Sequence, residues 1–180
     1  MLNRIFLIGF MGSGKSHTGR RLSTILDMPL IDLDHWIESR EGQSVQEIFS
    51  TSGETYFREI ERAALHQMAD YEKVIVACGG GTPCFFDNMD WMNQQGITIY
   101  LQTPVAELCR RLLPEMAHRP LLKDQNKETL PEFIREKLAM REPYYMQAQV
   151  IADLPEALEE MLVALKEQLV KISTNASPSI

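Results

Sequence analysis

The sequence contains little cysteine, no long apolar run and no excess of basic residues. Its three cysteines, Cys78, Cys84 and Cys109, include no CxxC pair, which argues against a disulfide framework or a zinc site and fits a reducing compartment. No apolar stretch approaches the length of a membrane-spanning helix. The net charge of −7 argues against a nucleic acid or a membrane as the main partner, because both require a basic face. We therefore expect a soluble, cytoplasmic protein.

One domain is expected, because 180 residues suffice for one well-buried core and are too few for two ordinary domains. The apolar content of 44% and the charged content of 24% are typical of a globular chain, so neither disorder nor a fibrous fold is indicated. No repeat or linker interrupts residues 1–172, which we assign to a single domain. Residues 173–180 are polar and lack periodicity, and we expect them to form a flexible tail.

The residues that follow the first apolar run fit a phosphate-binding motif. Residues 9–16 read Gly-Phe-Met-Gly-Ser-Gly-Lys-Ser, the GxxxxGK[ST] phosphate loop, and lie between a strand-like and a helix-like segment, as that motif requires. Glycines let the backbone turn its N–H groups toward phosphate oxygens, and the helix N-terminus adds positive potential. Lys15 is expected to neutralise the β- and γ-phosphates and Ser16 to bind Mg²⁺. A nucleoside-triphosphate site is the prediction.

The same N-terminal residues could instead be a short secretory signal, since Arg4 precedes an apolar stretch that reaches Met11. We reject this interpretation because Gly9 interrupts the stretch and Lys15 follows closely. A cleaved peptide would also not retain a complete phosphate loop.

Short apolar segments alternate with longer helical patterns along the chain. The expected strands are Arg4–Ile8, Leu30–Asp32, Lys73–Ala77, Thr98–Leu101 and Gln149–Ala152. The expected helices are Lys15–Leu26, Asp34–Arg40, Ser44–Ser50, Glu54–Ala69, Phe86–Gln95, Pro104–Leu113, Leu130–Tyr145 and Pro155–Ile172. This alternation predicts an α/β fold in which helices cover both faces of a parallel sheet, because parallel strands need crossover connections and are buried.

In such a sheet the ligand site lies beyond the carboxyl ends of the strands. The second strand ends in Asp32-Leu33-Asp34, two carboxylates that lie on the same side of an extended segment. We expect one to face a metal and the other to meet a substrate. The alternative is that Asp34 only caps the next helix.

The third strand runs into Gly79-Gly80-Gly81, and three consecutive glycines are costly to order. Bare backbone is therefore required there. We interpret this as the close approach of a small substrate. The backbone N–H groups could bind its hydroxyl or carboxylate groups. A loose turn is the alternative, although turns more commonly combine one or two glycines with Asn or Asp.

Three arginines lie in short motifs: Arg58 in Phe-Arg-Glu-Ile-Glu, Arg119 in Arg-Pro-Leu-Leu, and Arg141 in Arg-Glu-Pro-Tyr-Tyr. Each alone could be a solvated helix charge. Taken in order with the phosphate loop, the Asp-Leu-Asp segment and the triple glycine, however, the set resembles the shikimate kinase family over residues from about 4 to about 155.

The resemblance implies ATP-dependent phosphorylation of the 3-hydroxyl of shikimate, which yields shikimate 3-phosphate and ADP in aromatic amino-acid biosynthesis. It implies a three-layer P-loop kinase fold similar to nucleoside monophosphate kinases, with a five-stranded parallel sheet of order 2-3-1-4-5. It also implies a mobile lid at about residues 114–128, Mg²⁺ as cofactor and a monomer whose partners are only its small-molecule substrates.

The resemblance also assigns roles to individual residues. Asp34 would bind the reacting hydroxyl, and Arg58 and Arg141 would hold the substrate carboxylate. The predicted ATP-binding residues are Gly12, Ser13, Gly14, Lys15, Ser16, His17, Arg111 and Arg119. The predicted shikimate-binding residues are Asp34, Phe49, Phe57, Arg58, Gly79, Gly80, Gly81 and Arg141. The predicted catalytic residues are Lys15, Asp34 and Arg119, and the predicted metal-binding residues are Ser16 and, through a water, Asp32.

Two other functions remain open. One is a kinase with a different acceptor, such as a gluconate kinase or a nucleoside monophosphate kinase, against which Arg58, Arg141 and the triple glycine argue. The other is a regulatory protein that kept the nucleotide-binding fold and lost the chemistry, against which the complete set of predicted catalytic residues argues.

Overall fold

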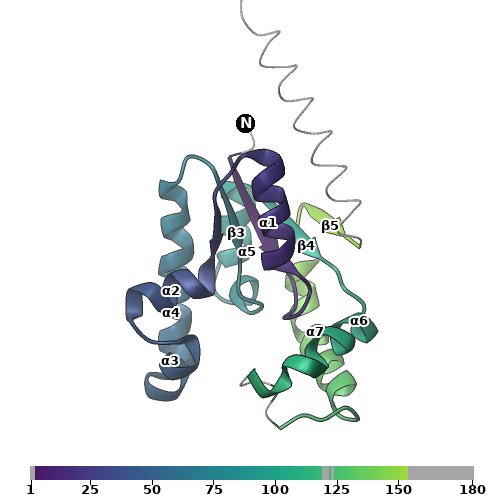
Figure 1. Ribbon diagram of the computed structural model, residues 1–180. Coiled ribbons are helices and arrows are strands. Elements are labelled where there is room, and N and C mark those ends of the chain that lie inside the picture. Colours follow the sequence, from purple (N-terminus) through teal and green to yellow (C-terminus); the bar gives the residue numbers. More distant parts are fainter. Residues whose placement is uncertain (1–2, 119–121, 123, 154–180) are drawn as a thin grey trace, which may run out of the picture.

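The computed structural model describes residues 3–118, 122 and 124–153 (Figure 1). Its strands are β1 (Arg4–Ile8), β2 (Leu30–Asp32), β3 (Val74–Ala77), β4 (Ile97–Leu101) and β5 (Val150–Ala152). They pair in parallel in the order β2-β3-β1-β4-β5. The predicted α/β fold class and strand order are thus confirmed.

Helices connect these strands, and most lie where the sequence pattern predicts them. They are α1 (Lys15–Leu26), α2 (Leu33–Glu41), α3 (Val45–Thr51), α4 (Gly53–Gln67), α5 (Asn88–Gln95), α6 (Val105–Leu112) and α7 (Leu130–Tyr145), with 3₁₀ helices η1 (Met68–Asp70), η2 (Thr82–Cys84) and η3 (Leu113–His118). The start predicted at Phe86 is wrong, because that residue has a φ of 52°, in the left-handed region that a right-handed helix excludes. The predicted helix Pro155–Ile172 and the tail lie outside the described residues.

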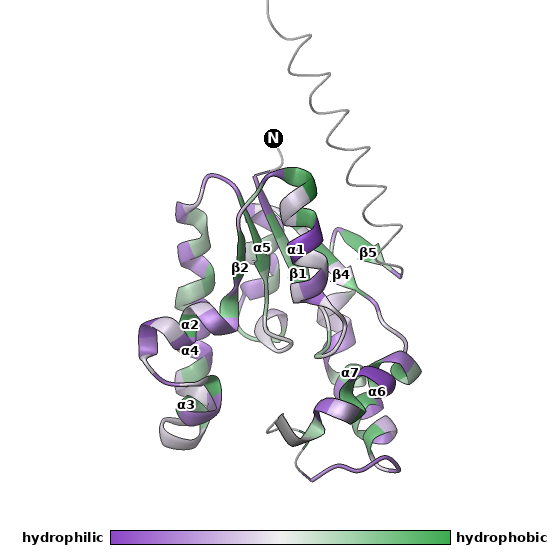
Figure 2. Cartoon of the chain, viewed as in Figure 1, coloured by the Kyte–Doolittle hydropathy of each residue, from purple (hydrophilic) through white to green (hydrophobic). Residues whose placement is uncertain are grey.

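The two faces of the sheet carry separate apolar clusters because side chains alternate along each strand. Phe6 and Ile8 of β1 pack with residues of α2, α4, α5 and α7. Ile5 and Leu7 point the other way and pack with Leu22 of α1. Figure 2 shows the hydrophobic colour concentrated in the strands, while the helices are mixed. Helices therefore cover both faces of the sheet, which is the three-layer arrangement predicted.

A third apolar cluster lies between α6 and α7. It comprises Phe10, Leu108, Leu112, Leu122, Leu130 and Ile134. Leu122 is fully buried in it, so the segment predicted to be a lid, residues 114–128, is anchored at this side chain and begins as η3. Residues 119–121 and 123 lie outside the described part, and motion of the lid stays a prediction.

The register of the sheet brings three motifs to one edge. Leu7 of β1 and Asp32 of β2 both pair with Ala77 of β3. The phosphate loop, the aspartate segment and the triple glycine therefore leave the sheet side by side at its carboxyl edge. Figure 1 shows α2, α3 and α4 on one side of this edge and α6 and α7 on the other. Within the described ranges, no helix is long and apolar enough to span a membrane.

Candidate active site

The phosphate loop has the backbone conformation for which its glycines are needed. Gly9, Gly12 and Gly14 have φ values of 142°, 79° and 95°, which glycine adopts without the steric cost that other residues meet. Gly14 is the N-cap of α1, so the positive end of the helix lies directly at the loop. The loop can therefore bind an anion with backbone N–H groups.

Lys15 extends back over this loop. Its Nζ donates to the carbonyl oxygens of Gly9 and Phe10, both at 2.9 Å. A phosphate oxygen is a stronger acceptor for an ammonium group than a neutral carbonyl. The amine is thus already placed where the phosphates of a bound nucleotide would lie.

The predicted metal-binding residues are in contact with each other. Ser16 Oγ donates to Asp32 Oδ2 at 2.8 Å. Hydroxyl and carboxylate oxygens next to a phosphate loop are the donor set that Mg²⁺ takes in nucleotide sites, with waters and phosphates completing its shell. These two side chains therefore fit Mg²⁺.

The capping residue of α2 is Asp32 and not Asp34, so the capping alternative is wrong. The Asp32 side chain accepts from the His35 backbone N–H at 3.4 Å. Asp34 lies in the first turn of α2, because the helix begins at Leu33 rather than at the predicted Asp34. The prediction that both carboxylates share an extended segment is wrong for the same reason.

Asp34 combines burial with a set of neighbouring charges. Burial is the main cause that raises the pKa of its carboxyl from 3.8 to about 6, and Glu61 and Asp32 raise it further, while Lys15 acts in the opposite direction. A carboxylate with a pKa in this range can accept a proton from a hydroxyl near neutral pH. This is the property expected of a catalytic base.

The three consecutive glycines each face one predicted site residue. A Cβ atom on Gly79 would lie 2.9 Å from Asp34 Oδ1, and one on Gly80 would lie 3.2 Å from Arg141 Nη1. A Cβ atom on Gly81 would lie 2.7 Å from both terminal nitrogens of Arg58. The bare backbone thus makes room for the side chains of the site, a reason that the sequence alone did not reveal.

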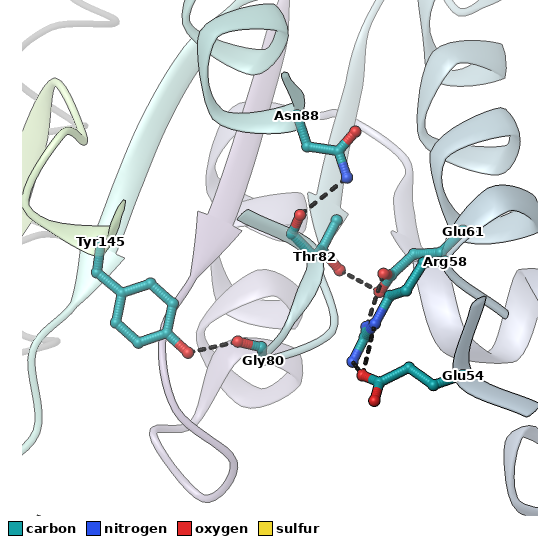
Figure 3. Close-up of polar contacts among 7 residues, drawn as sticks. All are labelled: Glu54, Arg58, Glu61, Gly80, Thr82, Asn88 and Tyr145. Atoms are coloured by element: carbon teal, nitrogen blue, oxygen red, sulfur yellow. Dashed lines mark hydrogen bonds and ion pairs between the residues drawn. The ribbon is translucent and has the colours of Figure 1, made fainter. Parts of the chain in front are cut away.

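Arg58 of α4 is buried between two carboxylates (Figure 3). Its Nη1 donates to Glu61 Oε2 at 2.8 Å, and its Nε and Nη2 donate to Glu54 Oε1 at 3.2 and 3.0 Å. Glu61 is 1% exposed and accepts a further hydrogen bond from Thr82 Oγ1 at 2.6 Å. Fully paired in this way, a buried carboxylate is tolerated.

Glu54, Glu61 and Thr82 had no role in the sequence-based prediction. The glutamates lie four residues before and three residues after Arg58, the helix spacings at which opposite charges meet. That spacing was the available signal for both of them.

Arg141 and Tyr145 of α7 approach the glycine loop from the other side. The Tyr145 hydroxyl donates to the Gly80 carbonyl at 2.5 Å (Figure 3), and its ring packs 5.0 Å from that of Tyr100. Tyr145 thus fixes the loop to the helix that carries Arg141. The predicted motif contained this tyrosine, but the prediction gave it no role.

Aromatic rings surround the Arg58 guanidinium. The predicted pair Phe49 and Phe57 pack together with ring centroids 4.6 Å apart. Their centroids lie 5.7 and 5.2 Å from Arg58 Cζ. Phe85 lies closer, at 4.1 Å, and was missed because no recognised motif contains it.

All predicted site residues in the described part of the chain line one of two adjoining cavities. The larger, of about 740 Å³, is lined by the phosphate loop together with His17, Asp32 and Arg111. The smaller, of about 200 Å³, is lined by Phe49, Phe57, Arg58, Glu61, Gly81 and Arg141. Both are lined by Met11, Asp34, Gly79 and Gly80. Asp34 therefore lies where the cavities meet.

Two predicted nucleotide contacts line the larger cavity, and a third lies outside the described residues. His17 is exposed on α1. Arg111 Nη1 donates to the Gly12 carbonyl at 3.1 Å, and its Nε donates to Glu107 at 2.6 Å. Arg119 lies outside the described residues, so its role at the transferred phosphoryl group stays a prediction.

Comparison with known proteins gives consistent matches. The family model for shikimate kinase matches residues 11–169. A shikimate kinase from Parabacteroides distasonis is 45% identical over 159 residues, which cover 88% of this chain and 92% of that protein.

The chain is also similar to solved structures of shikimate kinases. A crystal structure of shikimate kinase from Bacteroides thetaiotaomicron superposes with a TM-score of 0.82 at 40% identity, covering 94% of this chain and 98% of that one. A shikimate kinase from Acinetobacter baumannii in complex with shikimate superposes with a TM-score of 0.81 at 30% identity, covering 98% and 97%.

Proposed function

The chain belongs to the shikimate kinase family, and from this premise we propose that it transfers the γ-phosphoryl group of ATP to the 3-hydroxyl of shikimate. The enzyme is a phosphotransferase of the shikimate pathway, and its product is shikimate 3-phosphate. The observation that carries the proposal is the position of Asp34, which lines both the phosphate-loop cavity and the smaller cavity that contains two arginines. Two reactants bound in these cavities would meet at this carboxylate.

The smaller cavity would hold shikimate. Arg58 and Arg141 both line it, and a guanidinium binds a planar carboxylate with two hydrogen bonds. Phe49 and Phe57 would pack against the carbon ring, and Gly79, Gly80 and Gly81 would offer backbone to its hydroxyls. A carboxylate held at the arginines leaves the hydroxyl groups of the ring directed toward Asp34.

The larger cavity would hold ATP. Backbone N–H groups of Gly12, Ser13 and Gly14 would bind the phosphates, and Lys15 would exchange its carbonyl partners for phosphate oxygens. Ser16 and Asp32, already 2.8 Å apart, would hold Mg²⁺, Asp32 through a water. Bound Mg²⁺ would draw negative charge from the phosphate oxygens.

Asp34 would orient the attacking hydroxyl and accept its proton. The hydroxyl oxygen forms a bond to the γ-phosphorus while the bond from that phosphorus to the β–γ bridging oxygen breaks, and ADP leaves. Phosphoryl transfer of this kind asks the protein for positioning and charge neutralisation. Arg119 is proposed to contribute to that neutralisation. Because both cavities are built from one chain, we propose that a monomer is active.

A coupled assay of ADP release tests this function. With MgATP present, we expect ADP release with shikimate and none above background with gluconate or AMP. Release with gluconate or AMP in place of shikimate would assign a different acceptor. Binding of ATP without release with any of the three would favour the regulatory alternative.

A further inference from the structure

We propose that Phe85 is a positioning residue that fixes the plane of the Arg58 guanidinium for the carboxylate of the substrate. Its ring centroid lies 4.1 Å from Arg58 Cζ, against 5.2 Å for Phe57 and 5.7 Å for Phe49. Phe85 lines neither of the two cavities. Its effect on the substrate is therefore exerted through Arg58. The inference rests on the proposed role of Arg58 in shikimate binding.

The edges of the guanidinium are already partly occupied. An arginine carries five N–H groups in one plane. Glu54 accepts from Nε and from one hydrogen of Nη2, and Glu61 accepts from one hydrogen of Nη1. One hydrogen on each terminal nitrogen remains for a further acceptor. The carboxylate of shikimate would accept from Arg58 only if the guanidinium is correctly oriented.

Of the two carboxylate contacts, the one with Glu54 leaves the guanidinium plane able to tilt. The Glu54 side chain is 56% exposed, so it can follow the guanidinium as the group tilts. A ring against the face opposes the tilt, because both groups are flat and the ring quadrupole attracts the cation. Phe85, the closest of the three rings, makes this contact.

The loop that carries Phe85 is itself held in place. The Cys84 N–H donates to the Gly81 carbonyl at 2.8 Å, and the Asn88 N–H donates to the Phe85 carbonyl at 3.3 Å. Asn88 Nδ2 also donates to the Thr82 carbonyl at 2.9 Å (Figure 3). The backbone that carries the ring is thus held relative to α5, so that the ring can serve as a support.

The same loop lies against Arg58 at Gly81 and contacts its partner Glu61 through Thr82. Thr82 is fully buried and donates to Glu61, the partner of Nη1. Gly81 leaves no room for a methyl group beside the terminal nitrogens. Gly81 and Phe85 therefore both lie next to this arginine, and Phe85 contributes the contact with an aromatic ring.

Replacing Phe85 by Leu or by Met tests the proposal by steady-state kinetics. Both changes keep apolar volume and remove the ring. We expect the KM for shikimate to rise about tenfold, within the range of a partly desolvated cation–π contact, while kcat and the KM for ATP stay within twofold. Phe85→Tyr keeps the ring face and should restore the KM for shikimate to within twofold of the unsubstituted enzyme.

A neighbouring phenylalanine provides the matched control. Phe86 is 56% exposed and its ring lies 5.2 Å from Arg62 Cζ rather than against Arg58. Phe86→Leu should leave the KM for shikimate unchanged. Thermal unfolding of every variant shows whether a change in kinetics accompanies a loss of fold.

The proposal is wrong if Phe85→Leu and Phe85→Met leave the KM for shikimate unchanged, or if the KM for ATP rises as much. It is also wrong if neither variant folds while Phe85→Tyr does, because Phe85 would then be a core residue. An unsubstituted enzyme that shows no shikimate-dependent ADP release would overturn the proposed function instead, so the two failures are distinguishable.

Discussion

The two adjoining cavities are built in different ways. The nucleotide cavity contains one continuous stretch of chain, residues 11–18, which supplies both its backbone donors and Lys15, and other segments complete its lining. The acceptor cavity draws on α2, α3, α4, the glycine loop and α7. The phosphate-binding part of the nucleotide cavity is therefore a local structure that a short motif specifies. The acceptor cavity exists only once distant helices have packed.

The cations of the two cavities also differ in their partners. Lys15 donates to the neutral carbonyls of Gly9 and Phe10, whereas Arg58 is paired with the carboxylates of Glu54 and Glu61. Charged hydrogen bonds are shorter and stronger than neutral ones. Lys15 is thus held where it can exchange partners, whereas Arg58 is held beside its two carboxylates.

Asp34→Asn should have the largest effect, because this residue serves both cavities. We expect kcat to fall by about 10²- to 10⁴-fold, the usual contribution of a general base, while ATP affinity changes little. Kinetics and calorimetric ATP titration measure the two quantities. Loss of ATP affinity in parallel with the rate would contradict the assignment of Asp34 to the acceptor.

Arg141→Ala should affect one cavity only. We expect the KM for shikimate to rise about 10- to 100-fold, corresponding to lost hydrogen bonds between charged groups, with a smaller effect on the KM for ATP. An equal rise in both KM values would show that Arg141 serves the nucleotide. Arg141 could then not be assigned to the acceptor cavity alone.

The pH dependence should report Asp34. Its pKa is raised to about 6 in the folded enzyme, so kcat/KM for shikimate should fall as the pH drops through about 6 and the carboxylate takes up a proton. The measurement is kcat/KM for shikimate over the roughly three pH units from 5 to 8, which include that pKa. A constant value over this range would contradict the role of Asp34 as base.

The raised pKa of Asp34 also affects the stability of the fold, and in the direction opposite to its effect on activity: the contribution of Asp34 to the free energy of unfolding decreases as the pH rises. A carboxyl whose folded pKa is raised favours the fold when protonated, below about pH 4, and this contribution is lost as the pH rises through about 6. Asp34→Asn should therefore raise the free energy of unfolding by about 3 kcal/mol at pH 7.5, and by much less at pH 4. Urea unfolding at the two pH values measures it, and an equal change at both would refute the electrostatic cause.

Thr82→Val should have the smallest effect and concerns the acceptor cavity alone. It removes the donor to the buried Glu61 carboxylate, at a cost of about 1 to 3 kcal/mol in the free energy of unfolding. Ser23→Ala is a control, because it removes the hydroxyl that donates to the Met28 carbonyl at a residue that lines neither cavity. Only the Thr82 variant should also raise the KM for shikimate.

The sequence was sufficient for the parts that local rules determine. The alternation of short apolar strands and helices gave the sheet and its layers, and the phosphate loop gave the nucleotide cavity. Its ordered motifs also indicated Asp34, Arg58 and Arg141. The starts of α2 and α5 differ from the predicted starts. Asp32 caps α2, which therefore begins one residue earlier than predicted, and the positive φ of Phe86 excludes it from α5.

Contacts between distant segments were not predictable in this way. Tyr145 and Gly80 are 65 residues apart in the chain, and Thr82 and Glu61 are 21 apart. No propensity or spacing rule connects such pairs. The reason for the triple glycine is of the same kind, because the side chains that need the space come from α2, α4 and α7.

The central claim is that the two cavities meet at Asp34 so that a phosphoryl group passes between two bound reactants. Phosphorus NMR of a reaction of the purified chain with MgATP and shikimate tests it most directly. The account predicts one phosphate ester on the 3-oxygen of shikimate for each ADP formed, and much slower formation of the same ester with Asp34→Asn. ADP accompanied by inorganic phosphate in place of the ester would contradict it.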